Sequence, residues 1–168
     1  SSNSSLNIIK KNFKNEPLNF SLFAFLFIGL FLLASAPITN ADSLDYHVGV
    51  ALHILNYSEF PSMPEWFHSR LAGAGELAIA LGLSIGAEQF GSMIQFSGLI
   101  SIIGLILGVQ SKYGHSLKKN KFFLVLAALS APTIVFLVSS PKPQMLQIAS
   151  IILSLGIAVF GMKINNKK

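Results

Sequence analysis

Cysteine is missing from this 168-residue sequence, and charged side chains are scarce. Without cysteine the chain can form no disulfide, iron–sulfur cluster or thiolate metal site. Only 11% of the residues are charged, whereas a soluble globular domain carries about 25%. The mean hydropathy is +0.61. This composition excludes a soluble enzyme domain, a nucleic-acid-binding module and a disordered chain, and it predicts a membrane protein.

Apolar runs of 17 to 19 residues recur along the chain, and a helix of about this length can cross the hydrocarbon core of a bilayer. They cover residues 18–36, 71–87, 93–109, 122–139 and 145–162. The run 71–87 contains Glu76, which is costly at the bilayer centre, and many small residues that suit close helix packing. We therefore expect a short juxtamembrane or re-entrant helix there and four membrane-spanning helices from the other runs. The predicted fold class is all-α, a polytopic integral membrane protein.

Lysines and acidic residues occupy different parts of the chain. Lysines cluster before the first run, between residues 112 and 121, and after residue 162, whereas six of the seven carboxylates lie within residues 42–88. Because cytoplasmic loops are enriched in Lys and Arg, four crossings place all three clusters and both termini in the cytoplasm. The acidic stretch then forms one external loop, residues 38–91. The predicted domains are a polar cytoplasmic tail (1–17), a transmembrane domain (18–162) and a basic cytoplasmic end (163–168).

An amphipathic helix is predicted at the start of the external loop, capped by Asp42 or Ser43 and ending near Tyr57. On a wheel of 100° per residue it has two faces. The polar face holds Asp42, Asp45, Tyr46, Gly49, His53 and Asn56, and the apolar face holds Leu44, Val48, Ala51, Leu52 and Leu55. Such a helix lies in the interface plane, with its apolar face on lipid or on the bundle. Asp42 is either a helix cap or a reactive carboxylate, because two acids one turn apart suit the sharing of a cation, a proton or a substrate hydroxyl.

The second half of the external loop is rich in turns. Arg70, the single arginine of the sequence, lies at the mouth of an apolar run. It either grips a lipid phosphate or pairs with Glu65 or Glu76. Trp66 suits the headgroup region of a membrane.

Metal and haem sites are weakly indicated. The histidines all lie outside the predicted spans, at positions 47, 53, 68 and 115, whereas membrane haems usually take their ligands from within spans. Asp42, Asp45 and His53 could together hold a divalent cation, although hard oxygen sites usually need more ligands. A divalent cation is therefore the one cofactor considered, and its ligands stay open.

The order of elements over residues 18–162 matches a known pattern. A span is followed by a proline and an acidic motif, PITNADSLDYHVG. A proline-containing turn, EFPSMPEWFHSR, and a small-residue helix that ends in Phe-Gly, LAGAGELAIALGLSIGAEQFG, come next. A later span and turn read LVLAALSAPTIVFLVSSPKPQ. This order resembles the membrane glycosyltransferases of the GT-C class, which include the protein mannosyltransferases and the lipid A aminoarabinose transferases.

The resemblance implies a reaction and a set of site residues. In that class the acidic residue of the first external loop lies beside the acceptor and acts as a base or helps to bind a metal. By position Asp42 would take this role, and Asp45 would be the second acid, although its spacing departs from the commoner Asp-Glu or Asp-x-Asp. The predicted substrate-binding residues are Tyr46, His53, His68 and Arg70. Phosphate contacts of the last two are a physical inference, since no motif of the class fixes them.

The sequence therefore predicts the N-terminal part of a membrane glycosyltransferase, because the class has more spans than four. It would move a sugar from a polyprenyl-phosphate donor to an acceptor at the outer surface of the bacterial cytoplasmic membrane. The alternative is a non-catalytic four-helix subunit or anchor of a larger complex. The predicted partners are the lipid bilayer, the lipid-linked donor and, for the alternative, other membrane subunits, with no nucleic acid.

Overall fold

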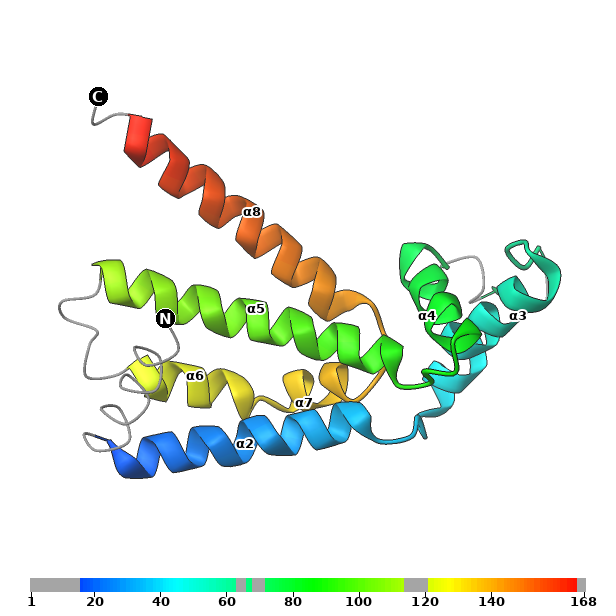
Figure 1. Cartoon of the computed structure of the whole chain (residues 1–168), viewed down its shortest axis with the longest axis horizontal. Helices are drawn as coiled ribbons and strands as arrows, with labels where there is room; N and C mark the ends of the chain where they lie inside the picture. Colours follow the sequence, from blue (N-terminus) through cyan, green and yellow to red (C-terminus); the bar gives the residue numbers. More distant parts are fainter. Residues whose placement is uncertain (1–15, 63–65, 68–71, 114–120, 166–168) are drawn as a thin grey trace.

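The computed structural model describes residues 16–62, 66–67, 72–113 and 121–165, and these residues form helices and connecting segments with no strand among them. The helices are α2 (Pro17–Ser35), the π-helix η1 (Ser43–Val48), α3 (Gly49–Tyr57), α4 (Ala74–Ser84), α5 (Phe90–Tyr113), α6 (Lys121–Leu129), α7 (Pro132–Val138) and α8 (Gln144–Asn165). The predicted all-α class is confirmed for this part of the chain (Figure 1).

Helices α2 and α5 are the two described helices that are long and apolar enough to cross a membrane. The core helix of a soluble protein can pass the same test of length and composition. However, α2 leaves large apolar side chains exposed, among them Leu18 (71%) and Phe25 (74%). Apolar surface of this kind is typical of a helix that contacts lipid or another apolar partner. The two helices thus support association with a membrane.

The predicted span 122–139 is interrupted in its middle. Between α6 and α7, Ala131 has an extended backbone, and Pro132 begins α7. Proline lacks the N–H that would continue a helix, and it disfavours helical geometry at the preceding residue. The predicted span 145–162 falls within α8, whose described apolar part, Gln144–Ala158, is shorter than a full span. The topology with four crossings therefore stays a prediction.

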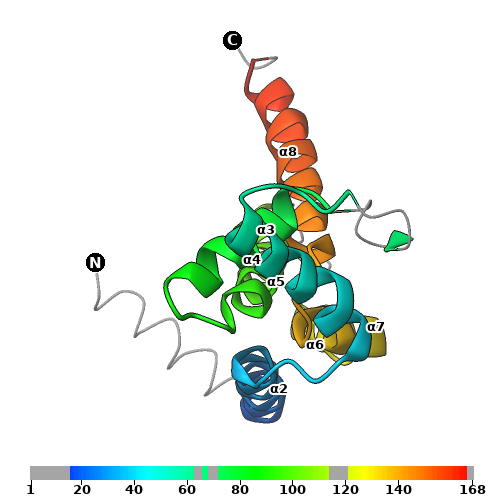
Figure 2. The same ribbon diagram turned by 90° about the vertical axis from the view of Figure 1, so that its right-hand side faces the viewer.

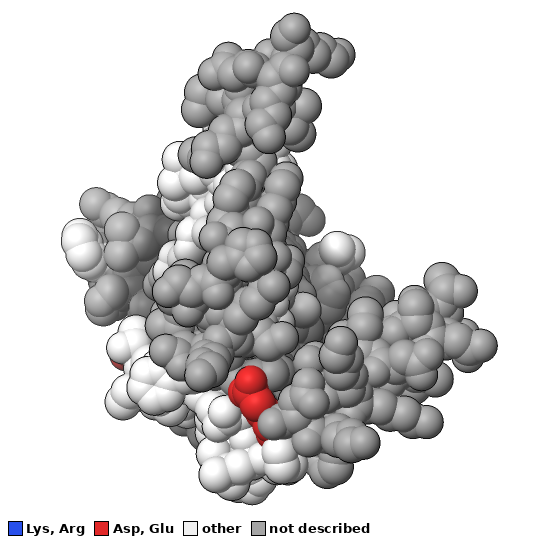
Figure 3. All heavy atoms as spheres, turned by 90° about the vertical axis from the view of Figure 1, so that its left-hand side faces the viewer, with Lys and Arg blue, Asp and Glu red and all other residues white. Residues whose placement is uncertain are grey.

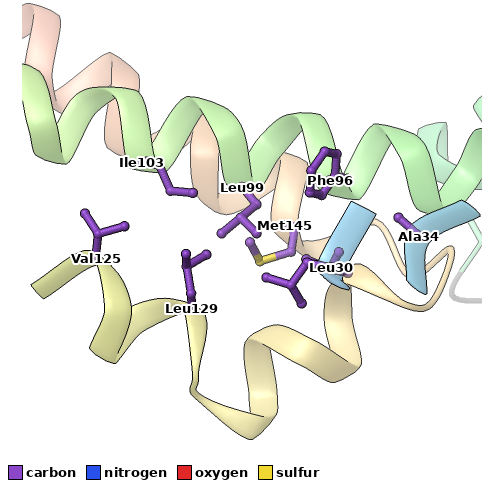
Figure 4. Close-up of a cluster of buried hydrophobic side chains, with 9 residues drawn as sticks. Leu30, Ala34, Phe96, Leu99, Ile103, Val125, Leu129 and Met145 are labelled. Carbon is purple, nitrogen blue, oxygen red and sulfur yellow. The ribbon is translucent and has the colours of Figure 1, made fainter. Parts of the chain in front are cut away.

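Four helices pack into a bundle whose core is completed by the start of α8 (Figure 4). The buried side chains of this core are Leu30 and Ala34 of α2, Phe96, Leu99 and Ile103 of α5, Val125 and Leu129 of α6, Val138 of α7 and Met145 of α8. At Gly98 the two longest helices touch, because a Cβ there would lie 2.9 Å from the backbone oxygen of Met145. Helix α8 stays in contact with α5 as far as Gly156, where a Cβ would lie 3.4 Å from Leu105, and its far end lies away from α2, α6 and α7 (Figure 1).

Helices α3 and α4 form a second layer that covers one end of the bundle (Figures 1 and 2). Helix α2 ends there, and α5 and α8 begin there, whereas α2 and α6 begin at the opposite end (Figure 1). Ala51 of α3 packs against Ile79 and Ala80 of α4. The 11 residues of α4 measure about 16 Å along the axis, which is too short for a bilayer core of about 30 Å. This agrees with the short helix predicted for the run 71–87.

The predicted amphipathic helix is present, but its cap differs from the prediction. The helix ends at Tyr57, as predicted, and Ser58 follows in the left-handed conformation with φ 59°. At the other end, the backbone N–H of Ser43 donates a hydrogen bond to Oδ1 of Asn40 at 3.2 Å. The Asp42 side chain makes no capping hydrogen bond. Asn40 therefore caps the helix, and the carboxylate of Asp42 is left for other contacts.

The wide turns of η1 change which side chains face the protein. An ideal α-helical wheel gives a polar and an apolar face, but the structure has a third, buried face. This buried face holds Ser43, His47, Val50 and Ala51. The leucines of the predicted apolar face stay 39% to 47% exposed: Leu44, Leu52 and Leu55. The predicted wheel was therefore incomplete, because a π-helix has more residues per turn than the 3.6 on which the wheel rests.

Candidate functional site

An ion pair joins the first predicted acid to a lysine that is 100 positions away in the sequence. Nζ of Lys142, in the turn between α7 and α8, lies 3.3 Å from Oδ2 of Asp42. The lysine side chain is 10% exposed, whereas the aspartate side chain is 66% exposed. The ammonium group also lies 4.8 Å from the ring centroid of Phe136, a distance at which a cation is attracted to the ring. The pair thus presents an accessible carboxylate in front of a sheltered positive charge.

The other predicted residues of the helix make contacts of their own. Asp45 is exposed. The ring of Tyr46 is tilted against that of His47, with 4.2 Å between centroids, and the ring of His53 is tilted against Tyr57 at 4.6 Å. Trp66 packs its ring against Gly49, because a Cβ there would lie 3.1 Å from the indole.

Two predicted phosphate contacts, His68 and Arg70, lie outside the described residues. Within the described ranges, no group of three or more His, Asp or Glu side chains could hold a metal ion. The arrangement of Asp42, Asp45 and His53 therefore does not fit a metal held by the protein, and no reaction step is derived through one.

A buried pair between η1 and α4 was missed by the sequence reasoning. Nδ1 of His47 lies 2.6 Å from Oε1 of Glu76, and the two side chains are 6% and 5% exposed. Oε2 of the same carboxylate accepts a hydrogen bond from the backbone N–H of Gly73 at 2.7 Å. The signal in the sequence was the single carboxylate in an apolar helix, because a buried charge requires a partner. The partner could not be read from an ideal wheel.

Opposing effects act on the pKa of Glu76. Burial raises it, while the hydrogen bonds from His47 and from the backbone N–H groups of Gly73 and Glu76, together with the charge of His47, lower it more in sum. The net pKa is below that of an ordinary glutamate. The carboxylate is therefore ionised at neutral pH; its hydrogen bond with His47 ties η1 to α4, and its bond from Gly73 caps the start of α4.

Buried polar side chains gather at this same end of the bundle. Those that the structure describes are Ser43, His47, Glu76, Ser92, Gln95, Ser140 and Lys142. They come from η1, from α4, from the first turns of α5 and from the turn before α8, so they separate the apolar core from the outer layer. A cavity of about 130 Å³, which Pro141 and Pro143 help to line, adjoins this polar layer.

Comparison with known protein families assigns the chain to one of them. The family model described as the DUF1420 N-terminal domain matches residues 3–168. The chain belongs to this family. No curated protein and no solved structure matches the chain. The candidate site of this DUF1420 N-terminal domain is therefore identified from its geometry alone. It consists of the exposed carboxylate of Asp42 and the buried ammonium group of Lys142, next to a layer of buried polar side chains.

Proposed function

We propose that the chain is the N-terminal part of a membrane glycosyltransferase. It would move a sugar from a polyprenyl-phosphate donor to an acceptor at the outer surface of the bacterial cytoplasmic membrane. The observation that carries this proposal is the pair of Asp42 with Lys142, at the bundle end where α2 stops and α5 starts. Transfer from a lipid phosphate needs a base and a positive charge at this depth.

The proposed topology has four crossings, made by α2, by α5, by α6 with α7, and by α8. Figure 3 looks at the end where α2 begins, and its described surface is mostly uncharged with a small acidic area. In the sequence, lysine clusters precede α2, lie between residues 112 and 121, and follow residue 162, and with four crossings they favour the cytoplasm for the end where α2 begins. Ser130, Pro132 and Thr133 are exposed at the break, so a crossing made by α6 with α7 requires a further protein surface or water to satisfy the backbone groups there.

The chemistry follows from the ion pair. As the acceptor oxygen attacks the anomeric carbon, Asp42 takes the proton of the acceptor hydroxyl. The bond from the anomeric carbon to the phosphate oxygen breaks, and the phosphate leaves with the electron pair. Lys142 stabilises its negative charge. Because an arriving phosphate competes for the ammonium group, donor binding also frees the carboxylate to act as the base.

The remaining site residues have supporting roles in the proposal. Asp45, Tyr46 and His53 lie on the helix of the proposed base and would contact the donor sugar or the acceptor. His68 and Arg70, from the same external segment, would add contacts to the phosphate.

Transfer by the full-length gene product in liposomes tests the proposal. Radiolabelled mannosyl-, glucosyl- and aminoarabinosyl-phosphoundecaprenol are the donor probes, and movement of the label to a membrane extract or to water is measured. We expect Asp42→Asn to lower transfer by about 10² to 10⁴, the usual contribution of a general base. Lys142→Gln should lower it by a similar factor, because it removes the charge that holds the phosphate.

The matched control is Glu59→Gln, which removes an exposed carboxylate just after α3 and should leave transfer unchanged. Equal amounts of inserted protein must be compared. Full transfer by inserted Asp42→Asn would refute the assignment of the base. No transfer by the unchanged protein from any probe would argue against the donor class.

A specific observation favours the non-catalytic alternative. Helix α8 exposes Ile151 (60%), Leu155 (61%) and Ile157 (73%), and its far end lies away from α2, α6 and α7 (Figure 1). A second membrane chain could pack on this surface. This function predicts that Asp42→Asn and Asp45→Asn are nearly silent and that fixed partners co-purify with the protein, whereas purification as a lone, fully folded monomer argues against it.

A further inference from the structure

A groove lies between η1, α3 and α4 on one side and, on the other, the segments that follow α2 and precede α5. Its volume is about 250 Å³. The residues that line it are Pro37 and Ile38 after α2, Leu44, Val48 and Leu52 of η1 and α3, Leu83 of α4, and Glu88 and Gln89 before α5. Its walls are thus apolar, with one carboxylate and one amide among them. We refer to these eight residues as the interfacial groove.

The helices that adjoin the groove indicate how deep in the membrane it would lie. Pro37 and Ile38 follow the last residue of α2 by two and three positions, and Glu88 and Gln89 directly precede α5. These helices pack side by side, with 5.1 Å between the ring centroids of Phe27 and Phe96. If both cross the membrane, the groove lies where lipid headgroups meet the hydrocarbon chains. Its apolar floor therefore suits an acyl chain.

The charge at this end of the protein decides which headgroup fits. Four described carboxylates are exposed there, on Asp42, Asp45, Glu59 and Glu88. Among the residues that line the groove, Glu88 is the charged one. An anionic lipid would therefore meet like charge at the groove, whereas an ammonium headgroup would meet opposite charge. Within the described residues, Glu88 forms no ion pair that would compete.

We propose that the interfacial groove binds one phosphatidylethanolamine molecule of the surrounding membrane, with an acyl chain against its leucines and the ammonium group on Glu88. The ammonium donates a charge-assisted hydrogen bond to the carboxylate. The amide of Gln89 is placed to contact the phosphate or an ester oxygen. This site goes beyond the proposed glycosyl transfer, and it depends on membrane placement alone.

Native mass spectrometry of the full-length protein in mild detergent tests this site. Dioleoyl phosphatidylethanolamine and dioleoyl phosphatidylglycerol are the two probes, since they differ in the headgroup alone. We expect the protein to retain one phosphatidylethanolamine with about tenfold preference, the factor expected for one charge-assisted hydrogen bond. Glu88→Gln should abolish the preference, while Glu59→Gln, which removes an exposed carboxylate outside the groove, should keep it.

A second variant tests the apolar part of the site. Leu83→Trp fills the groove and should lower the retention of both lipids. If this variant fails to fold, Glu88→Gln still decides the proposal, because its side chain is exposed and its loss leaves the core intact. Equal retention of both lipids by the unchanged protein, or an unchanged preference in Glu88→Gln, would overturn the site. Neither result bears on transfer by Asp42→Asn, so the two proposals fail separately.

Discussion

The pair of His47 and Glu76 should make a large contribution to the stability of the outer layer. The carboxylate accepts hydrogen bonds from His47 at 2.6 Å and from the backbone N–H of Gly73 at 2.7 Å, and it is buried. Hydrogen bonds to charged groups contribute about 1.5 to 3 kcal/mol each, and removing one partner of a buried pair costs about 3 to 5 kcal/mol. We therefore expect Glu76→Ala to lower the free energy of unfolding by about 3 to 5 kcal/mol.

A double-mutant cycle isolates the contribution of the pair. Unfolding of the full-length protein is measured in mixed micelles for Glu76→Ala, His47→Ala and the double variant. Because each single change leaves a buried group without its partner, the double variant should lose about 1 to 3 kcal/mol less than the sum of the two. Glu59→Ala, at an exposed site, should stay within about 0.5 kcal/mol of the unchanged protein. Additive losses would refute the reasoning.

The pair also predicts a dependence of stability on pH. The pKa of Glu76 is lower in the folded protein than in the unfolded chain. Its contribution to stability is therefore complete above the unfolded pKa and is lost as the pH falls through the folded pKa. In Glu76→Ala this part of the acid sensitivity should disappear. Identical acid unfolding titrations for both proteins would show that folding does not lower the pKa of Glu76 and would contradict this prediction.

Two further predictions concern packing and sidedness. Gly98→Ala should destabilise the protein by about 1 to 3 kcal/mol, because its Cβ would lie 2.9 to 3.0 Å from backbone atoms of α8. The control, Gly104→Ala, has open space around it and should be neutral or stabilising by up to about 1 kcal/mol. Equal effects of the two changes on the free energy of unfolding would contradict this packing. A cysteine that replaces the exposed Asn56 should react with an impermeant maleimide added outside intact cells. A cysteine that replaces Ser116, between α5 and α6 in the sequence, should react only after the membrane is opened. Labelling of both cysteines from the same side would contradict the topology.

Some elements could be predicted from the sequence because local composition decides them. The apolar run 18–36 gave α2 almost to the residue, since its length and hydropathy have no competing signal. The end of the amphipathic helix at Tyr57 was also predicted. The break at Pro132 had a local signal in the Ala-Pro step, but the length of the apolar run outweighed it in the prediction.

The site depends on contacts that no local pattern encodes. The pairing of Asp42 with Lys142 joins residues that are 100 positions apart, and a lysine in a turn is usually solvated. The burial of His47 depends on the π-helix of η1, which shifts the register by an amount that a wheel of 100° per residue cannot anticipate. Asp42 was proposed from its position after the apolar run 18–36, whereas its pairing with Lys142 is visible only in the fold.

The distance in sequence between Asp42 and Lys142 has a consequence for biogenesis. Asp42 is synthesised 100 positions before Lys142, so the ion pair can form only after the turn between α7 and α8 has been made and has packed against the outer layer. During synthesis the carboxylate of Asp42 is therefore present before its counter-ion. A nascent chain arrested before Lys142 would hold Asp42 without this lysine, so the proposed site would stay incomplete until the last helices are made.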